Sequence, residues 1–379
     1  MRTTRFLVAG AASVAVLGAV TACGGSKSND TAANGDGRIA VTATDTECQV
    51  AKTDSNAGAV HFTVTNKGSK VTEFYVYAAG DRVMGEVENI APGVTRELLV
   101  DLSAGTYETA CKPGMVGKGL RGPFKVSGVA KSADNATELA EATASYQRYV
   151  KSQSTALIDK TTEFVNAVKA GDIEKAKALF PVARTYWERI EPVAEAFGDL
   201  DPAIDAREAD LEPGQEFTGF HKLEKDLWVT KDVSKSGPIA DKLIADVQKI
   251  VDEANKVQLT PVQMANGAKE LLDEVATGKI TGEEDAFSHT DLWDFQANVE
   301  GSQAAVAALR PVLDGKDPAL GKTLDEKFAA VEAALEKHRS GDGWKSYTDL
   351  TQADLKELTD VINALAEPIS KVAATVATK

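Results

Sequence analysis

The hydrophobic pattern of the chain changes its period once, near residue 130, and no other feature constrains the fold as strongly. In residues 38–129, apolar and polar residues alternate; within Gly58–Asn66, for example, Val60, Phe62 and Val64 share one face. Turn signals rich in Gly and Pro separate such stretches. We therefore expect a β-sandwich, with strands at 39–43, 58–66, 71–77, 94–100, 106–109 and 124–129.

From residue 136 onward, Ala, Leu, Glu and Lys dominate and the apolar spacing becomes helical. We expect helices at 155–169, 242–257, 261–276, 286–309, 324–338 and 350–373. Long helices joined by short links indicate a helical bundle. The sequence thus predicts a multidomain protein, with a β-sandwich over residues 37–130 and an all-α bundle over residues 136–379.

The amino terminus is typical of an export signal rather than of a folded element. Arg2 and Arg5 precede an apolar run, and small residues precede Cys23. This pattern predicts a signal peptide over residues 1–22 and lipidation of Cys23, as in bacterial lipoproteins. Residues 23–36 are polar and rich in Gly, Ser and Asn, which is typical of a flexible tether. We expect an exported protein, lipid-anchored to the outer face of the cell membrane.

The charge balance narrows the range of partners. The chain has 57 acidic and 42 basic residues, for a formal net charge of −15. A protein this acidic repels phosphate backbones, which argues against a nucleic-acid partner. The same negative field concentrates cations near the protein.

The strongest chemical signal lies between Gly219 and Trp228. His221 and Glu224 are three residues apart, so on a helix both side chains point to one side. An imidazole and a carboxylate on one face make half a metal site, and neighbouring helices of a bundle can supply the rest. Such pairs also occur on solvated helix surfaces, so spacing alone leaves both interpretations open.

Further imidazole and carboxylate groups are candidates for the rest of this site. Of the four histidines, His289 resembles His221 because both are followed by acidic residues and a Leu-Trp pair. Upstream of His221, Glu188 and Glu191 are also three residues apart. From position and chemistry, we predict these additional metal ligands: Glu188, Glu191, His289, Asp291 and Asp294. For any one of these acids, a solvated helix face is the alternative.

The β-domain contains a second constellation. Cys48 and Cys111 are its only cysteines, and in an exported domain they can form a disulfide. Alternatively, they stay as thiolates and hold a metal together with acids such as Glu73, Glu86 and Glu88. The residue types leave both alternatives open.

These motifs together resemble the EfeO family, the extracytoplasmic components of EfeUOB-type iron-uptake systems. The resemblance is carried by residues 86–93 and 105–111 of the β-domain and by residues 219–224 and 288–298 of the helical part. It covers nearly all of residues 37–379. It implies a cupredoxin-like β-sandwich followed by an imelysin-like helical bundle.

The resemblance also implies a function. Members of this family capture iron, as Fe²⁺ or Fe³⁺, outside the membrane and deliver it to a membrane iron permease, alongside a haem-peroxidase-like protein. His221 and Glu224 match the family's HxxE metal motif. Cys48, Glu73 and Cys111 match β-domain positions proposed to hold metal, and we add Glu88 to this second site. Copper and zinc accept the same ligand types, so these types do not settle the metal.

Two enzymatic alternatives compete with iron delivery. Imelysin-like domains are grouped with peptidases, which suggests a metallopeptidase-like hydrolase. However, the chain has neither a His-Glu-x-x-His motif nor a Gly-x-Ser-x-Gly motif. Copper-assisted iron oxidation by the β-domain is the other alternative, but this domain has only His61 and so lacks the two histidines of a type-1 copper site. We therefore expect a binding protein and not an enzyme, with a purely structural role as the remaining alternative.

Overall fold

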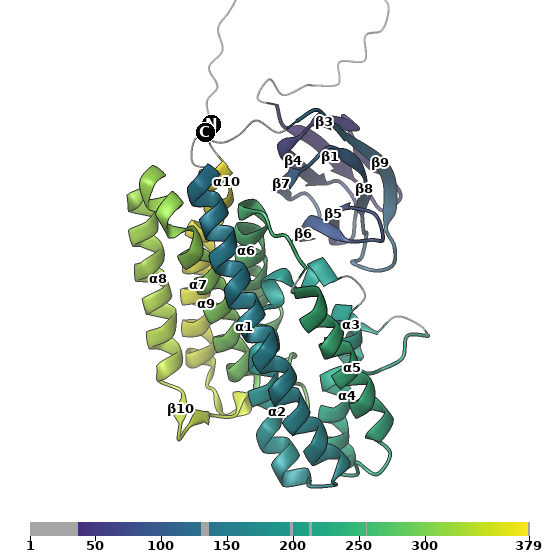
Figure 1. Ribbon diagram of the computed structural model, residues 1–379, viewed down its shortest axis with the longest axis vertical. Helices are drawn as coiled ribbons and strands as arrows, with labels where there is room; N and C mark the ends of the chain where they lie inside the picture. Colours follow the sequence, from purple (N-terminus) through teal and green to yellow (C-terminus); the bar gives the residue numbers. More distant parts are fainter. Residues whose placement is uncertain (1–36, 130–135, 198–199, 212–213, 255, 378–379) are drawn as a thin grey trace, which may run out of the picture. The chain divides into compact units, whose positions relative to one another are not determined.

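A computed structural model describes residues 37–129, 136–197, 200–211, 214–254 and 256–377 (Figure 1). The predicted signal peptide (1–22), the Cys23 lipidation site and the tether (23–36) lie outside these residues. Within the described ranges, no helix is both long enough and apolar enough to cross a membrane.

The N-terminal part of the described chain consists of strands. They are β1 (Ile39–Ala43), β2 (Cys48–Val50), β3 (Asp54–Asn56), β4 (Gly58–Asn66), β5 (Thr72–Tyr77), β6 (Val83–Ile90), β7 (Thr95–Leu102), β8 (Gly105–Cys111) and β9 (Leu120–Ser127). The strands form two sheets, ordered β2-β1-β4-β7 and β3-β9-β8-β5-β6. The pairs β1–β4 and β3–β9 are parallel and the others are antiparallel. This is the predicted β-sandwich.

Buried and partly exposed residues alternate along β4, as the sequence predicts. Val60, Phe62 and Val64 are buried in the sandwich core, and the intervening residues are partly exposed. Phe62 packs against Phe74 of β5 and Phe124 of β9, so aromatic rings from the two sheets meet in the core.

A disulfide joins Cys48 of β2 to Cys111 of β8, with the two Cα atoms 5.5 Å apart. It therefore links the two sheets of the sandwich. Of the two alternatives that the residue types leave open, the structure contains the disulfide. In this oxidised form neither cysteine offers a thiolate, so the predicted β-domain metal site with Cys48 and Cys111 as thiolate ligands is not formed.

The remaining described chain is mostly helical. Its helices are α1 (Ala136–Lys169), α2 (Ile173–Glu188), α3 (Leu200–Asp205), α4 (Gly219–Lys225), α5 (Gly237–Ala254), α6 (Pro261–Thr277), α7 (Asp291–Lys316), α8 (Pro318–Glu336), α9 (Gln352–Ile369) and α10 (Val372–Ala377). Short 3₁₀ segments are η1 (Glu191–Phe197), η2 (Glu208–Asp210), η4 (Lys279–Thr281) and η5 (Tyr347–Asp349), and η3 (Asp226–Thr230) is a π-helical turn.

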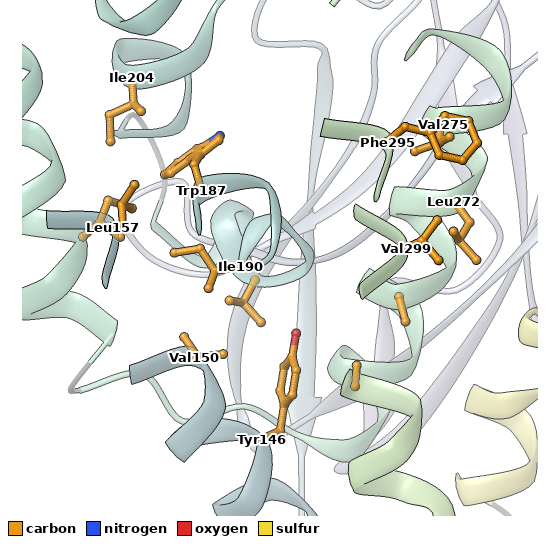
Figure 2. Close-up of a cluster of buried hydrophobic side chains, with 14 of the residues drawn as sticks. Tyr146, Val150, Leu157, Trp187, Ile190, Ile204, Leu272, Val275, Phe295 and Val299 are labelled. Carbon is orange, nitrogen blue, oxygen red and sulfur yellow. The ribbon is translucent and has the colours of Figure 1, made fainter. Parts of the chain in front are cut away.

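Apolar side chains from most of these helices form one core. Helix α1 packs against α2, α5 and α7, while α6 packs against α7 and α8 against α9. Figure 2 shows part of the core, where Tyr146 and Val150 of α1 lie in the same buried cluster as Trp187 of α2 and Phe295 of α7. The amphipathic spacing seen in the sequence thus becomes the inner face of a helical bundle.

Element boundaries differ from the sequence expectation in several places. Strands β2, β3 and β6 were not predicted, and a short hairpin of β10 (Arg339–Ser340) and β11 (Gly343–Trp344) lies in the helical part. Helix α1 begins at residue 136, whereas a helix was expected only from residue 155. Helix α7 begins at Asp291 rather than at residue 286, because the backbone of His289 is left-handed (φ 60°) and interrupts the helical path.

Candidate metal centre

A close approach between α3 and α4 positions the centre. Gly219, the first residue of α4, has a φ of 79°, and a Cβ atom there would lie 2.0 Å from the carbonyl oxygen of Ile204. Only glycine fits this backbone and this contact. The Thr218 hydroxyl also donates to the carbonyl oxygen of Ala203, at 2.9 Å. The end of α3, with Asp205, therefore lies directly against the start of α4.

Helix α4 carries His221 and Glu224 on one side, as their spacing predicts. His221 is 1% exposed and Glu224 is fully buried. The two side chains meet at 3.0 Å, between His221 Nδ1 and Glu224 Oε2. The other oxygen of Glu224 accepts hydrogen bonds from the backbone N–H groups of Phe287 (3.0 Å) and Ser288 (2.7 Å). Glu224 thus connects His221 to the loop that precedes α7.

The second ring nitrogen of His221 faces two carboxylates. Its Nε2 lies 3.6 Å from Asp205 Oδ1 and 3.7 Å from Glu284 Oε1, and it makes no hydrogen bond with any residue that the structure describes. Among the described residues, two groups have ligand-type atoms that all lie within 4.8 Å of one another. One consists of Asp205, His221 and Glu284, and the other of His221, Glu224 and Asp285.

A fully buried arginine lies among these acids. Arg184 of α2 is 0% exposed and forms ion pairs with Glu188, Asp205, Glu284 (2.9 Å), Asp285 (3.4 Å) and Asp294 (3.3 Å). These acids raise its pKa well above the usual range, although burial acts to lower it. The guanidinium is therefore a permanent positive charge in the centre.

Lys279 of η4 supplies a second buried charge. Its Nζ lies 2.8 Å from Glu188 Oε2 and 2.8 Å from Glu191 Oε2. The amide of Asn298 donates to the same two oxygens, at 2.7 Å and 2.8 Å. Burial acts to raise the pKa of Glu188, but Lys279 and Arg184 lower it overall, whereas burial and the neighbouring Glu188 raise the pKa of Glu191 well above its usual range.

The remaining acids come from the loop before α7 and from its first turn. Burial and neighbouring acids raise the pKa of Asp285 and Asp294 well above the usual range, and burial raises that of Asp291 to about 6. Burial and Arg184 lower the pKa of His221, but Asp205, Glu224 and Glu284 outweigh them and raise it to about 10. These three carboxyl groups and His221 therefore hold their protons more tightly than exposed groups do, because the centre has fewer basic groups than carboxyl groups.

We use the term acidic cluster for eight carboxylates and the basic groups among them. The carboxylates are Glu188, Glu191, Asp205, Glu224, Glu284, Asp285, Asp291 and Asp294. The basic groups are Arg184, Lys279, His221 and, at the edge, Arg207, whose Nη1 lies 3.6 Å from Glu284 Oε2. Carboxylates therefore outnumber the basic groups two to one.

Several buried atoms of the acidic cluster and of Asn298 beside it have no hydrogen-bond partner in the described part of the chain. They are His221 Nε2, Asp285 Oδ1, Asp291 Oδ2, Asp294 Oδ1 and Asn298 Oδ1. Buried polar atoms are nearly always paired, so each exception needs an explanation. Oxygen and imidazole nitrogen are ligand atoms for divalent and trivalent metal ions. The donor set therefore fits a metal ion.

The structure brings most of the predicted ligands together. His221, Glu224, Glu188, Glu191, Asp291 and Asp294 all belong to the acidic cluster. Among the described residues, the two ligand groups contain only His221 and Glu224 of the predicted ligands. His289 lies in neither group. The backbone of His289 instead shapes the loop, because its N–H donates to the carbonyl oxygen of Asp285 and its carbonyl oxygen accepts from the N–H of Tyr347.

Sequence reasoning missed six residues of the acidic cluster, namely Arg184, Asp205, Arg207, Lys279, Glu284 and Asp285. Asp205 begins an acidic segment, Asp205–Glu212, which no spacing in the sequence links to His221. The acidic run Glu283-Glu284-Asp285 just before His289 was a further signal that could have been used. The three basic residues among them gave no signal, because a buried Arg or Lys cannot be distinguished from a surface one by sequence alone.

The acids of the predicted β-domain site have other partners. Glu73 is buried and lies 3.8 Å from Lys112 Nζ, and Glu88 accepts a hydrogen bond from the Tyr75 hydroxyl at 3.1 Å. Among the described residues, the ligand groups include no residue of the β-domain.

Comparisons with known proteins match both domains. An imelysin family model matches residues 142–372, and a cupredoxin-like domain model matches residues 13–123. Proteins named "Iron uptake system component EfeO" from Escherichia coli O1:K1, E. coli K12 and Shigella flexneri are each 41% identical over 342 residues. Each match covers 88% of this chain and 90% of the relative.

The chain belongs to the EfeO family. This membership covers both domains, so the sandwich is cupredoxin-like and the bundle is imelysin-like. The EfeO relatives carry the name of an iron uptake component and not of a peptidase.

Proposed function

We propose that this protein is the iron-binding component of an iron-uptake system and that it binds iron at the acidic cluster. The observation that carries the proposal is the buried Nε2 atom of His221, which makes no hydrogen bond to the described residues and faces carboxylate oxygens of Asp205 and Glu284, in a centre with twice as many carboxylates as basic groups. A metal ion that displaces protons from this centre offsets the negative charge of its carboxylates, and carboxylate with imidazole suits Fe²⁺ and Fe³⁺. The names of the EfeO relatives support iron over zinc or copper.

The residues that would hold the ion are those of the two ligand groups. They are Asp205, His221, Glu224, Glu284 and Asp285. Arg184 and Lys279 hold the surrounding carboxylates in place before an ion arrives, because they pair with acids from several segments. The net charge of −15 favours the approach of cations from solution.

We also propose where the protein acts and with which proteins. The protein is exported through the signal peptide at residues 1–22 and anchored by a lipid on Cys23, with residues 23–36 as a tether. It passes iron to a membrane permease and works beside a haem-peroxidase-like protein. A Cys23→Ser variant would then leave the membrane fraction of the producing cells, whereas retention in that fraction would count against the anchor.

Metal content tests the binding function. We expect purified protein loaded with Fe(II) without oxygen to hold iron, and His221→Ala to lose it while keeping its helical circular dichroism. His61→Ala is the matched control, because this β-domain histidine is 25% exposed and lies 3.3 Å from the exposed side chain of Glu97, outside the acidic cluster. Equal iron in the wild type and His221→Ala would reject the site. Casein turnover that is lost in Glu224→Ala would favour the hydrolase alternative instead.

A further inference from the structure

We propose that the ion binds to Nε2 of His221 together with Asp205 and Glu284, and that Glu224 positions the imidazole without touching the ion. This inference rests on the proposed function, because it assumes that the acidic cluster binds a metal. It divides the His-x-x-Glu pair, whose two members share one helix face, into one ligand and one positioning residue.

The hydrogen bonds of Glu224 are already taken. Its Oε2 faces His221 Nδ1 at 3.0 Å, and its Oε1 accepts from the backbone N–H groups of Phe287 and Ser288. A carboxylate is only an acceptor, so Nδ1 carries the proton in this contact. If Glu224 moved to an ion, two partly buried backbone N–H groups and one imidazole N–H would lose their acceptor.

The opposite side of the ring remains available. Within the described chain, Nε2 makes no hydrogen bond, and it points between Asp205 Oδ1 at 3.6 Å and Glu284 Oε1 at 3.7 Å. These three atoms are mutually within 4.8 Å, so small movements, with loss of the proton on Nε2, bring them to coordination distance of one ion. Histidines that bind metals commonly donate their other N–H to a carboxylate, which is the relation between Nδ1 and Glu224.

Arg184 is compatible with this arrangement. It pairs with Asp205 Oδ1 and with Glu284 Oε1, which are the same two oxygens that face Nε2. Each carboxylate oxygen has two lone pairs, so one can accept from the guanidinium while the other faces the ion. Arg184 therefore holds the two carboxylates on the Nε2 side of the ring.

The second ligand group gives the competing arrangement. In that group, the ion would lie on the Nδ1 side with Glu224 and Asp285, whose Oδ1 is 4.0 Å from Nδ1. This placement requires Glu224 to release His221 and to share the oxygens that now hold the loop before α7. The Nε2 side breaks none of these hydrogen bonds.

The decisive experiment identifies the metal-bound nitrogen directly. The purified protein, with ¹⁵N-labelled histidine, is titrated with Zn(II) as a diamagnetic probe and followed by two-bond ¹H–¹⁵N correlation spectra. The His221→Ala variant identifies the His221 signals. We expect Nε2 to shift to the metal-bound range and Nδ1 to stay protonated; metal-bound Nδ1 would overturn the inference. No Zn(II)-dependent change at His221 would instead refute metal binding at the acidic cluster, which is the proposed function itself.

Affinities provide an independent readout. In anaerobic Fe(II) titrations, we expect Asp205→Asn and Glu284→Gln to abolish measurable binding. Glu224→Gln keeps the acceptor for Phe287 and Ser288, so it should retain one iron per protein with affinity reduced about 10–100-fold. Full loss in Glu224→Gln and Asp285→Asn, with wild-type affinity in Asp205→Asn, would place the ion on the Nδ1 side. The ¹⁵N spectra use unaltered protein, so they decide the question even where a variant does not fold.

Discussion

Replacing Arg184 by methionine tests whether the acidic cluster is held together by its own cations until a metal arrives. Arg184 is 0% exposed and pairs with acids from α2, α3, α7 and the loop before α7. Methionine fills much of the same space with a flexible apolar chain, but it carries no charge. The variant therefore keeps most of the packing and leaves the carboxylates without their central counter-ion.

The expected effect on stability follows from this burial. Removing one partner from a buried ion pair costs about 3–5 kcal/mol of unfolding free energy, because the remaining charge stays buried and uncompensated. At about 2–4 °C per kcal/mol for a domain of roughly this size, the metal-free variant should melt roughly 6–20 °C below the wild type. A bound ion supplies the missing positive charge, so saturating Fe(II) should raise the Tm of the variant more than that of the wild type.

Calorimetry with and without Fe(II), in the absence of oxygen, measures both effects. Arg310→Met is the matched control, because Arg310 is 26% exposed and pairs with the surface acids Asp314 and Asp325. Surface ion pairs contribute about 0–1 kcal/mol, so this control should melt within a few degrees of the wild type with or without iron. The reasoning is refuted if Arg184→Met melts like the control, or if Fe(II) raises the Tm of wild type and variant equally.

Three further outcomes are expected. Gly219→Ala places a Cβ 2.0 Å from a backbone oxygen at a positive φ, so urea unfolding should show a loss of at least about 2 kcal/mol of unfolding free energy, and iron affinity should fall. In the control Gly237→Ala, no atom lies within 4 Å of the added Cβ, so neither quantity should change. Equal behaviour of the two variants would contradict the packing argument. The double variant Cys48→Ser with Cys111→Ser should lose about 2–5 kcal/mol of unfolding free energy. Two reactive thiols in the unreduced, denatured wild-type chain, apart from any at Cys23, would show that the disulfide is absent. The pKa of Asp291 rises from 3.8 to about 6 on folding, so its ionisation destabilises the metal-free protein as the pH rises through this window. The stability of Asp291→Asn relative to wild type should therefore increase between pH 4 and pH 7. A difference in stability that does not depend on pH would exclude this explanation.

The sequence predicts the fold well because both domains have strong local periodicity. Alternation in residues 58–66 and helical spacing after residue 136 come directly from burial on one face of each element. Boundaries are less accurate where one residue or a tertiary contact decides them. The start of α7 depends on the left-handed backbone of His289, and the three-residue strands β2 and β3 have too few residues to show a period.

The candidate site was only partly predictable for a different reason. His221 and Glu224 share one turn of one helix, so their spacing alone places them together. Asp205 lies beside them because Gly219 contacts Ile204, the residue before it. Glu284 and Asp285 lie beside them because Glu224 accepts hydrogen bonds from the backbone of the loop that contains both residues. These contacts join residues distant in the sequence, and no period in the sequence encodes them.

The proposed ligands Asp205, His221 and Glu284 come from the end of α3, the start of α4 and the loop before α7. No short peptide of this chain contains all three, and an unfolded molecule has no reason to gather them. The iron retained after gel filtration therefore counts the native molecules in a preparation. A proteolytic cut that separates residue 205 from residue 284 and lets the pieces part would release the ion even when every individual helix survives.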